Sequence, residues 1–232
     1  MKEGKCLSST HWSVVLAAQD SDADLSRAAL SALCEKYWPP PYAYLRRKGY
    51  PEEEARDMTQ AFFARFLEKN YVHDASQQKG RFRSFFVACL NHFLANEWDA
   101  ARAQKRGGRV VRLALDEMAP YEPADDMTPE TAYERQWALS LLKHVLDRLK
   151  AEYIRAGKEA EFEALSAYLP GGPTPGPYVE PGKRIGMSEG AIKVAVHRLR
   201  KHYREVLRDE VAQTLADKEN VDQELRNLMS VL

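Results

Sequence analysis

The sequence lacks the features that mark secreted, membrane and metal-binding proteins. Its 232 residues contain only three cysteines, Cys6, Cys34 and Cys89, which lie far apart and have no metal-ligand spacing. An odd number of scattered cysteines, without a secretory signal, is typical of a reducing cytoplasm in which thiols simply pack. No apolar run approaches the roughly 18 residues that a membrane span needs. The sequence therefore predicts a cytoplasmic protein without a membrane span.

The patterns that support catalysis are also missing. The six histidines include no i, i+4 pair, and the cysteines do not cluster near any of them. Gly171 and Gly172 precede a proline instead of a helix start, which excludes a phosphate-binding or dinucleotide-binding loop. Glu53, Glu54 and Asp57 can share one helix face, but without a histidine there a solvated acidic surface is the better interpretation. We expect no enzyme activity, no catalytic residue, no cofactor and no metal.

Charges are balanced overall but segregated along the chain. The 34 basic and 34 acidic residues cancel, so any nucleic-acid binding must come from local charge. Eight Lys or Arg stand against two acids between Lys79 and Arg112, and the same ratio returns between Lys183 and Arg208. Seven acids and no base lie between Leu115 and Glu134. Two basic blocks around an acidic one indicate two DNA-facing modules joined by an extended, self-repelling linker.

Nearly every periodic segment is helical, and no alternating strand is convincing. The sequence predicts helices over about 24–48, 51–69, 83–103, 129–157, 159–168 and 189–215. The loop 170–177, PGGPTPGP, cannot be regular structure. In the tail, Val221, Leu225, Leu228 and Leu232 recur at helical spacing. A terminal helix packed on its own domain is favoured there over one that docks a regulator or covers the DNA-binding face. We predict an all-α fold.

The second basic block contains a helix with two different faces. Ser188 is a good N-cap, and Glu189 follows where the helix dipole favours an acid. Apolar residues recur every three or four positions from Ile192 to Val206, and cations occupy the other side. Such a helix can dock with one face and place its cations in a DNA major groove. A solvated basic face explains this segment alone equally well.

The first basic block combines aromatic residues with cations. Eight apolar residues crowd one helix from Phe82 to Trp98, with Arg81 and Arg83 at one end and three further bases beyond the other. Single-stranded DNA binding needs this combination, because bases stack on rings while phosphates meet charges. A base held in this way offsets part of the cost of opening the duplex. Because the spacing follows one helical face, we expect about two-thirds of the aromatic residues in the core and an exposed minority near Trp98.

The helix that precedes this block mixes polar and aromatic residues. Its periodicity predicts that Phe62, Phe66 and Leu67 point inward. The places of Asp57, Gln60, Phe63 and Arg65 are less clear. A mixed surface of this kind suits a protein interface, and a solvated helix face is at least as good an interpretation.

Four segments carry a resemblance to a known family. They are THWSVVLAAQD (10–20), YAYLRRKGYPEEEARDMTQAFFARFLEK (42–69), GRFRSFFVACLNHFLANEWDAARAQKRGG (80–108) and GMSEGAIKVAVHRLRKHYREVL (186–207). In this order they resemble bacterial RNA polymerase sigma factors of the extracytoplasmic-function type, the minimal kind with two conserved domains.

The resemblance implies a division of the chain and a function. Residues 1–106 would form the region 2 domain with an N-terminal extension, 107–132 an acidic linker, 133–212 the region 4 helix-turn-helix domain, and 213–232 a helical tail. The protein would bind core RNA polymerase through the β′ clamp helices and the β flap. It would recognise the minus-ten and minus-thirty-five elements of promoter DNA and promote melting, under the control of an anti-sigma protein or a kinase.

The resemblance also implies binding residues. Polymerase would be bound by Asp57, Gln60 and Phe63. The minus-ten element would be read and melted by Asn91, His92, Asn96, Trp98, Arg102, Lys105 and Arg106. The minus-thirty-five element would be contacted by Ser188, Glu189, Lys193, His197, Arg198 and Lys201. Many family members carry an arginine where Ala195 stands, so one groove contact is missing or moved. Pro181 falls inside the short helix expected before the turn, so that helix either begins near Pro181, with Glu180 outside it, or has a distorted first turn.

Two other functions fit the same sequence. One is a stand-alone helix-turn-helix regulator that binds duplex DNA without polymerase, as a symmetric dimer. The other is a helical adaptor whose basic faces meet acidic protein partners.

Overall fold

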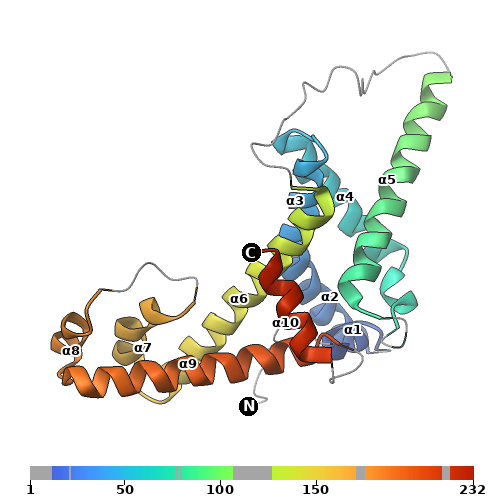
Figure 1. The fold of residues 1–232 in the computed structure, drawn as a ribbon. Helices are drawn as coiled ribbons and strands as arrows, with labels where there is room; N and C mark the ends of the chain where they lie inside the picture. The colour runs from blue at the N-terminus through green and yellow to red at the C-terminus, as the bar shows by residue number, and fades with distance from the viewer. Residues whose placement is uncertain are drawn as a thin grey trace. The chain divides into compact units, whose positions relative to one another are not determined.

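The computed structural model describes residues 12–20, 22–76, 78, 80–106, 127–170, 176–215 and 220–232. Every regular element in these ranges is a helix, which confirms the all-α class (Figure 1). Packing divides the chain into two compact units: unit 1 comprises 1–140 and 213–232, and unit 2 comprises 141–212. Most of the acidic linker (107–126) and part of the Gly/Pro loop (171–175) lie outside the described residues. No described helix is long and apolar enough to cross a membrane.

Unit 1 is a helical bundle. Its elements are α1 (Trp12–Ala18), α2 (Ala23–Tyr37), α3 (Pro39–Arg47), α4 (Glu52–Glu68), the 3-10 helix η1 (Tyr71–Asp74), α5 (Phe82–Arg106), the first part of α6 (Pro129–Arg155) and α10 (Val221–Ser230). The predicted helix 24–48 is two helices, because the prolines that follow Trp38 supply no backbone donors to continue α2. Asp22 caps α2 by accepting hydrogen bonds from the amides of Asp24 and Leu25.

Aromatic rings of α2, α4 and α5 form the core of unit 1. Phe86 lies at the centre, with its ring centroid 5.0 Å from Phe62, 5.1 Å from Phe66 and 4.9 Å from Tyr37. Edge-to-face and tilted pairs of this kind are favourable beyond their buried area. The prediction that most aromatic residues of α5 belong to the core, with Trp98 exposed, is confirmed.

The start of α6 and the tail both belong to unit 1. Tyr133 is fully buried there, and its hydroxyl lies 3.4 Å from the carbonyl of Arg83. The guanidinium of Arg83 lies over the Trp137 ring, 4.4 Å from its centroid. Residues 133–140, assigned to the second domain from the sequence, therefore pack in unit 1. The tail returns to the same unit, because Glu224 of α10 pairs with Arg83.

Unit 2 consists of the rest of α6, α7 (Glu159–Leu165), the 3-10 helix η3 (Ser166–Tyr168), α8 (Val179–Ile185) and α9 (Glu189–Ala212). Its core contains Leu149 of α6, Leu165 of α7 and Leu199 of α9, all fully buried. An ion network joins α6 to α9, since Arg148 Nη1 lies 2.8 Å from Glu210 Oε1 and 3.1 Å from Asp209 Oδ2. These contacts hold α9 along one side only, which leaves its other face to solvent.

Candidate nucleic-acid interfaces

A tight turn joins α8 to α9 in the second basic block. Gly186 ends α8 in the left-handed conformation, with φ 70°, which glycine adopts without strain. The Met187 amide then donates to the carbonyl of Gly182 over 2.9 Å. A β-carbon at Gly182 would lie 2.6 Å from the carbonyl oxygen of Met187, so the turn requires glycine at this position.

Pro181 lies in the first turn of α8. The helix begins before it, at Val179, and includes Glu180, so the first of the two alternatives, with Glu180 outside the helix, is wrong. Amides of a first helical turn have no partner within the helix, and the missing N–H of a proline costs no hydrogen bond there. The next amide, of Gly182, donates to the carbonyl of Tyr178 over 3.3 Å, so the turn closes despite the proline.

The N-cap and the apolar face of α9 are as predicted. Ser188 Oγ accepts a hydrogen bond from the amide of Ala191 over 3.3 Å, and Glu189 begins the helix. The predicted apolar stripe is at most 3% exposed and comprises Ile192, Val196, Leu199, Tyr203 and Val206. Ala195 joins this stripe at 8% exposure, so its side chain offers no outward contact.

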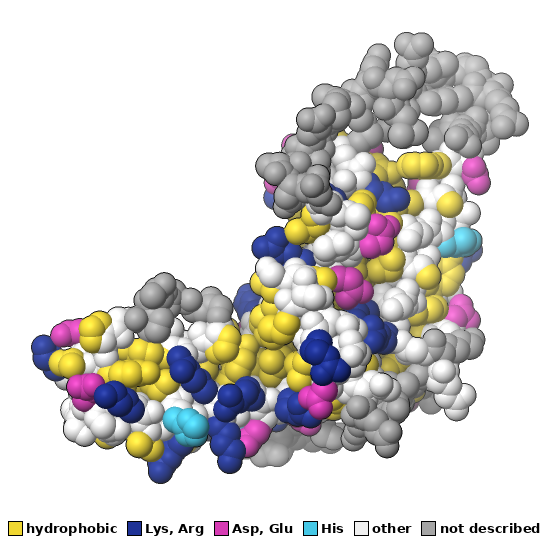
Figure 2. Space-filling view, viewed as in Figure 1, with side chains coloured by type: hydrophobic (Ala, Val, Ile, Leu, Met, Phe, Trp, Pro, Cys, Tyr) yellow, Lys and Arg dark blue, Asp and Glu magenta, His cyan; other side chains and the backbone are white. Residues whose placement is uncertain are grey.

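The opposite face of α9 carries the cations, and Figure 2 shows Lys and Arg side chains spaced along this helix. Two of its predicted DNA contacts are paired with acids. Lys193 Nζ lies 2.8 Å from Glu189 Oε1, and Lys201 Nζ lies 3.8 Å from Glu205 Oε1. The hydrogen bond from Lys193 and the charge of Glu189 raise the pKa of Lys193 above its ordinary value. Exposed pairs of this kind contribute little to stability, so both lysines can exchange their partner for a phosphate.

The other basic residues of this face differ in their availability. His197, Arg198 and Arg204 are exposed, and their side chains make no ion pair or hydrogen bond with any described residue. Arg200 instead donates from Nε to the carbonyl of Tyr168 over 2.8 Å, which ties α9 to η3. The arrangement offers an anionic ligand one row of free and weakly paired cations.

The predicted minus-ten residues lie on α5. Asn91, His92, Asn96 and Trp98 are exposed, whereas Phe93 and Leu94 between them are buried. His92 Nδ1 and Asn96 Nδ2 lie 3.3 Å apart, one helical turn from each other. The remaining predicted contacts lie in the last turns of α5, where the structure describes the backbone alone: Arg102, Lys105 and Arg106.

Two tyrosines outside α5 hold two of these side chains. Trp98 is 42% exposed, and its indole N–H donates to the hydroxyl of Tyr50 over 3.0 Å. The hydroxyl of Tyr44 donates to Asn91 Oδ1 over 2.6 Å and lies 3.2 Å from Glu130 Oε1. Neither tyrosine is predicted from the sequence, because a contact between separate helices leaves no local pattern.

Arg83 is not available to DNA. The sequence places it among the cations around the aromatic helix, but its side chain is 4% exposed and is paired with Glu134 and Glu224. Burial alone would lower the pKa of Arg83, but these two carboxylates outweigh burial and raise it. The residue fastens helices together.

Of the three predicted polymerase-binding residues of α4, two are exposed and one is buried. Asp57 and Gln60 are exposed, whereas Phe63 is 6% exposed and cannot itself be a major contact. The ring of Trp38 stacks on Phe63, with centroids 5.7 Å apart and planes inclined by 11°. Trp38 is 36% exposed. Leu67, one turn after Phe63, is 38% exposed, so the prediction that it points inward is wrong. The outward apolar surface here is that of Trp38 and Leu67.

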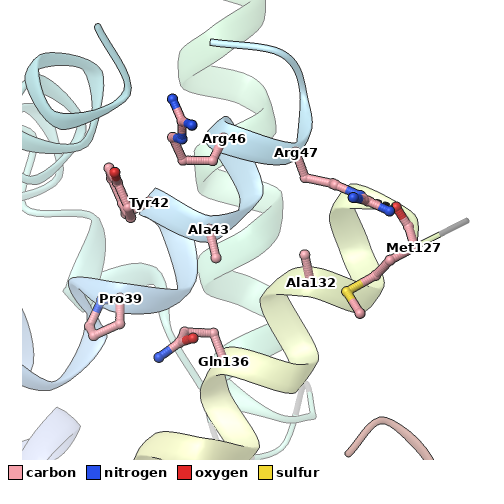
Figure 3. Close-up of a pocket in the computed structure, with 8 residues that line it drawn as sticks. All are labelled: Pro39, Tyr42, Ala43, Arg46, Arg47, Met127, Ala132 and Gln136. Atoms are coloured by element: carbon pink, nitrogen blue, oxygen red, sulfur yellow. Dashed lines mark hydrogen bonds between the residues drawn. The ribbon is translucent and has the colours of Figure 1, made fainter. Parts of the chain in front are cut away.

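A shallow hollow of about 430 Å³ lies between α3 and the start of α6 (Figure 3). Its lining residues are Pro39, Tyr42, Ala43, Arg46, Arg47, Met127, Ala132 and Gln136. Both guanidinium groups hold backbone carbonyls, since Arg46 donates to Tyr50 and Arg47 to Met127. The lining contains no carboxylate, histidine or cysteine. No group of three metal-ligating side chains occurs in the part of the chain that the structure describes.

The chain is similar to an ECF RNA polymerase sigma factor, SigE of Mycolicibacterium smegmatis. The two are 28% identical over 175 residues, which make up 75% of this chain and 59% of the relative. The chain thus spans less than two thirds of that relative's length. No family model matches the chain. No solved structure matches it either.

Proposed function

We propose that the protein is a sigma factor that directs core RNA polymerase to a promoter class and helps to open the DNA. The proposal rests on one observation. A chain that is similar to a sigma factor has two separate surfaces that suit DNA binding. One is the exposed face of α5 with Trp98, and the other is the cationic face of α9. Binding and strand separation constitute the mechanism, without covalent chemistry.

In this proposal unit 2 reads the minus-thirty-five element as a helix-turn-helix module. The turn at Gly186 and the cap at Ser188 start α9 abruptly, so that its first turns can enter a major groove. Arg198 and His197 are free to contact bases or phosphates, and Lys193 can leave Glu189 for the backbone. Because the apolar stripe of α9 is buried, the opposite face with its cations points outward.

Unit 1 reads and melts the minus-ten element. An exposed indole whose N–H is already bonded to Tyr50 presents its ring, and a flipped base can stack on that ring. Asn91, His92 and Asn96 supply polar groups on the same helix. Arg102, Lys105 and Arg106 would meet phosphates.

The exposed face of α4 would bind the β′ clamp helices of polymerase. Asp57 and Gln60 supply its polar groups. Trp38 supplies the large apolar contact that the sequence assigns to Phe63, because it covers Phe63 and is itself exposed. Tryptophan is the residue most often found at energetic centres of interfaces. The β flap and an anti-sigma protein or a kinase are further partners in this proposal.

Transcription reconstituted with purified bacterial core polymerase tests the function. A library of promoter fragments is transcribed with and without the chain, and promoter-dependent transcripts that require the chain are expected. The stand-alone regulator predicts a different result, namely a shift of duplex DNA by the chain alone with no initiation on any template. The adaptor predicts neither initiation nor a DNA shift.

A further inference from the structure

Asn91 is a predicted minus-ten contact whose side-chain oxygen is held by a buried residue. Tyr44 of α3 is 1% exposed, and its hydroxyl donates to Oδ1 of Asn91 on α5 over 2.6 Å. Asn91 itself is exposed, and its Nδ2 group has no hydrogen bond to any described residue. The side chain is therefore anchored by its oxygen and presents its amino group outward.

We propose that Tyr44 is a positioning residue that makes Asn91 a hydrogen-bond donor toward DNA and so gives the minus-ten element a keto base at the contacted position. A free asparagine offers both an acceptor and a donor, which is the basis of its paired contact with adenine. Because the hydroxyl of Tyr44 holds Oδ1, Asn91 offers DNA only its Nδ2 donor. The inference rests on the proposed sigma-factor function and deepens it.

The choice of base follows from the groups that a donor can meet. Guanine and thymine carry a keto oxygen at the edge where adenine and cytosine carry an amino group. At this site an outward N–H of Asn91 bonds a keto oxygen but faces an amino group donor to donor, which leaves adenine only its N7 as an acceptor. An unpaired polar group costs more free energy than a hydrogen bond contributes. Guanine or thymine is thus favoured at this position.

Tyr44 can hold this role throughout the physiological pH range. Burial first, and then the charge of Glu130, raise the pKa of Tyr44 to about 12. The hydroxyl therefore keeps its proton and remains a donor. Glu130, at the start of α6, lies 3.2 Å from the same hydroxyl and is the competing acceptor for that proton. Asn91 at 2.6 Å is the closer partner.

The test is promoter selection from a library with a randomised minus-ten element, using the full chain with core polymerase. The variants are Tyr44→Phe, Asn91→Ala and the double variant, with Tyr42→Phe as a matched control. Tyr42 lies on the same helix, and its hydroxyl has no hydrogen bond to any described residue. Thermal unfolding of each variant checks that the phenylalanine variants keep the fold.

The wild-type chain should select a keto base at one position. Tyr44→Phe should reduce the ratio of keto to amino bases at that position by about fivefold, the worth of one hydrogen bond. Asn91→Ala should abolish the preference at the same position, the double variant should match Asn91→Ala, and Tyr42→Phe should match the wild type. Other positions should keep their preferences.

Three results would overturn the inference. The first is an unchanged profile in Tyr44→Phe. The second is a selection of amino bases by the wild type at the position lost in Asn91→Ala, which would mean that Asn91 presents its oxygen. The third is a loss of preference spread over all positions, as a merely structural tyrosine would give. A wild-type chain that supports no initiation would instead refute the proposed function.

Discussion

Arg83 of α5 and Glu224 of α10 form a buried ion pair between residues 141 positions apart in the chain. The carboxylate is fully buried and also meets Arg81, whose Nη2 lies 2.7 Å from Glu224 Oε2. On its other side the Arg83 guanidinium reaches Glu134 and covers the Trp137 ring. One buried charge cluster thus fastens the tail and the start of α6 to α5.

Glu224→Ala should lower the free energy of unfolding of unit 1 by about 3 kcal/mol, because it leaves a buried arginine without one of its carboxylates. Denaturant unfolding followed by tryptophan fluorescence measures this directly. The four tryptophans, at positions 12, 38, 98 and 137, all belong to unit 1. Glu68→Ala removes an exposed, unpaired carboxylate of the same unit and should leave the midpoint nearly unchanged. Equal midpoints for the two variants would contradict a stabilising tail.

Arg198→Ala should weaken binding to duplex DNA with the minus-thirty-five element several-fold. If Arg198 meets a phosphate, the slope of log affinity against log salt should also fall by about 1. Fluorescence anisotropy of the complex with polymerase, at several salt concentrations, supplies both quantities. Arg155→Ala removes an exposed arginine at the end of α6, outside the predicted contact face, and serves as the control. A similar loss in both variants would indicate only a general charge effect.

Trp98→Ala should impair promoter opening more than closed-complex binding. A base stacked on an aromatic ring gains about 1–3 kcal/mol, so the fraction of open complexes should fall by about tenfold. Permanganate reactivity of thymines in the minus-ten element reports opening, and a gel shift at low temperature reports closed binding. Unchanged thymine reactivity would remove Trp98 from the melting step.

Trp38→Ala should weaken binding to core polymerase by about tenfold or more, as truncation of a tryptophan at an interface centre does. Titration of labelled polymerase with the chain measures the affinity. Leu25→Ala shortens another exposed apolar side chain, 56% exposed on α2, and should bind like the wild type. If the two variants bind equally well, the surface of Trp38 and Leu67 is not the contact.

Local patterns in the sequence predict most of the helices but few of their contacts. The Ser188 cap and the stripe from Ile192 to Val206 follow from spacing within one helix, and both are confirmed. The partners of Arg83 lie on distant helices, so its burial leaves no trace in the spacing of α5. The burial of Phe63 also depends on another helix, since the ring that covers it comes from Trp38. Chemistry that depends on pairing between elements requires the structure.

In unit 2, the stability of α9 should depend on pH through Glu152. Its carboxylate lies 2.6 Å from His202 Nε2 and 3.2 Å from Arg148 Nε. Burial alone would raise the pKa of Glu152, but the hydrogen bonds from His202 and Arg148 and their charges outweigh burial and lower it. A carboxyl whose pKa is lower in the folded state stabilises that state above its ordinary pKa. This contribution disappears as the pH falls through the folded value.

Glu152→Gln should therefore destabilise unit 2 near pH 7 by about 1 kcal/mol, the worth of one hydrogen bond. This effect should shrink as the pH falls below the ordinary pKa of glutamate. Hydrogen exchange of α9 peptides, corrected for intrinsic rates, is the suitable measurement, because unit 2 contains no tryptophan. Glu163→Gln, on an exposed residue of α7 whose side chain pairs with no described residue, is the control. A difference between Glu152→Gln and the wild type that stayed constant from pH 7 to pH 3 would show that packing, rather than the carboxylate charge, holds α9 at this point.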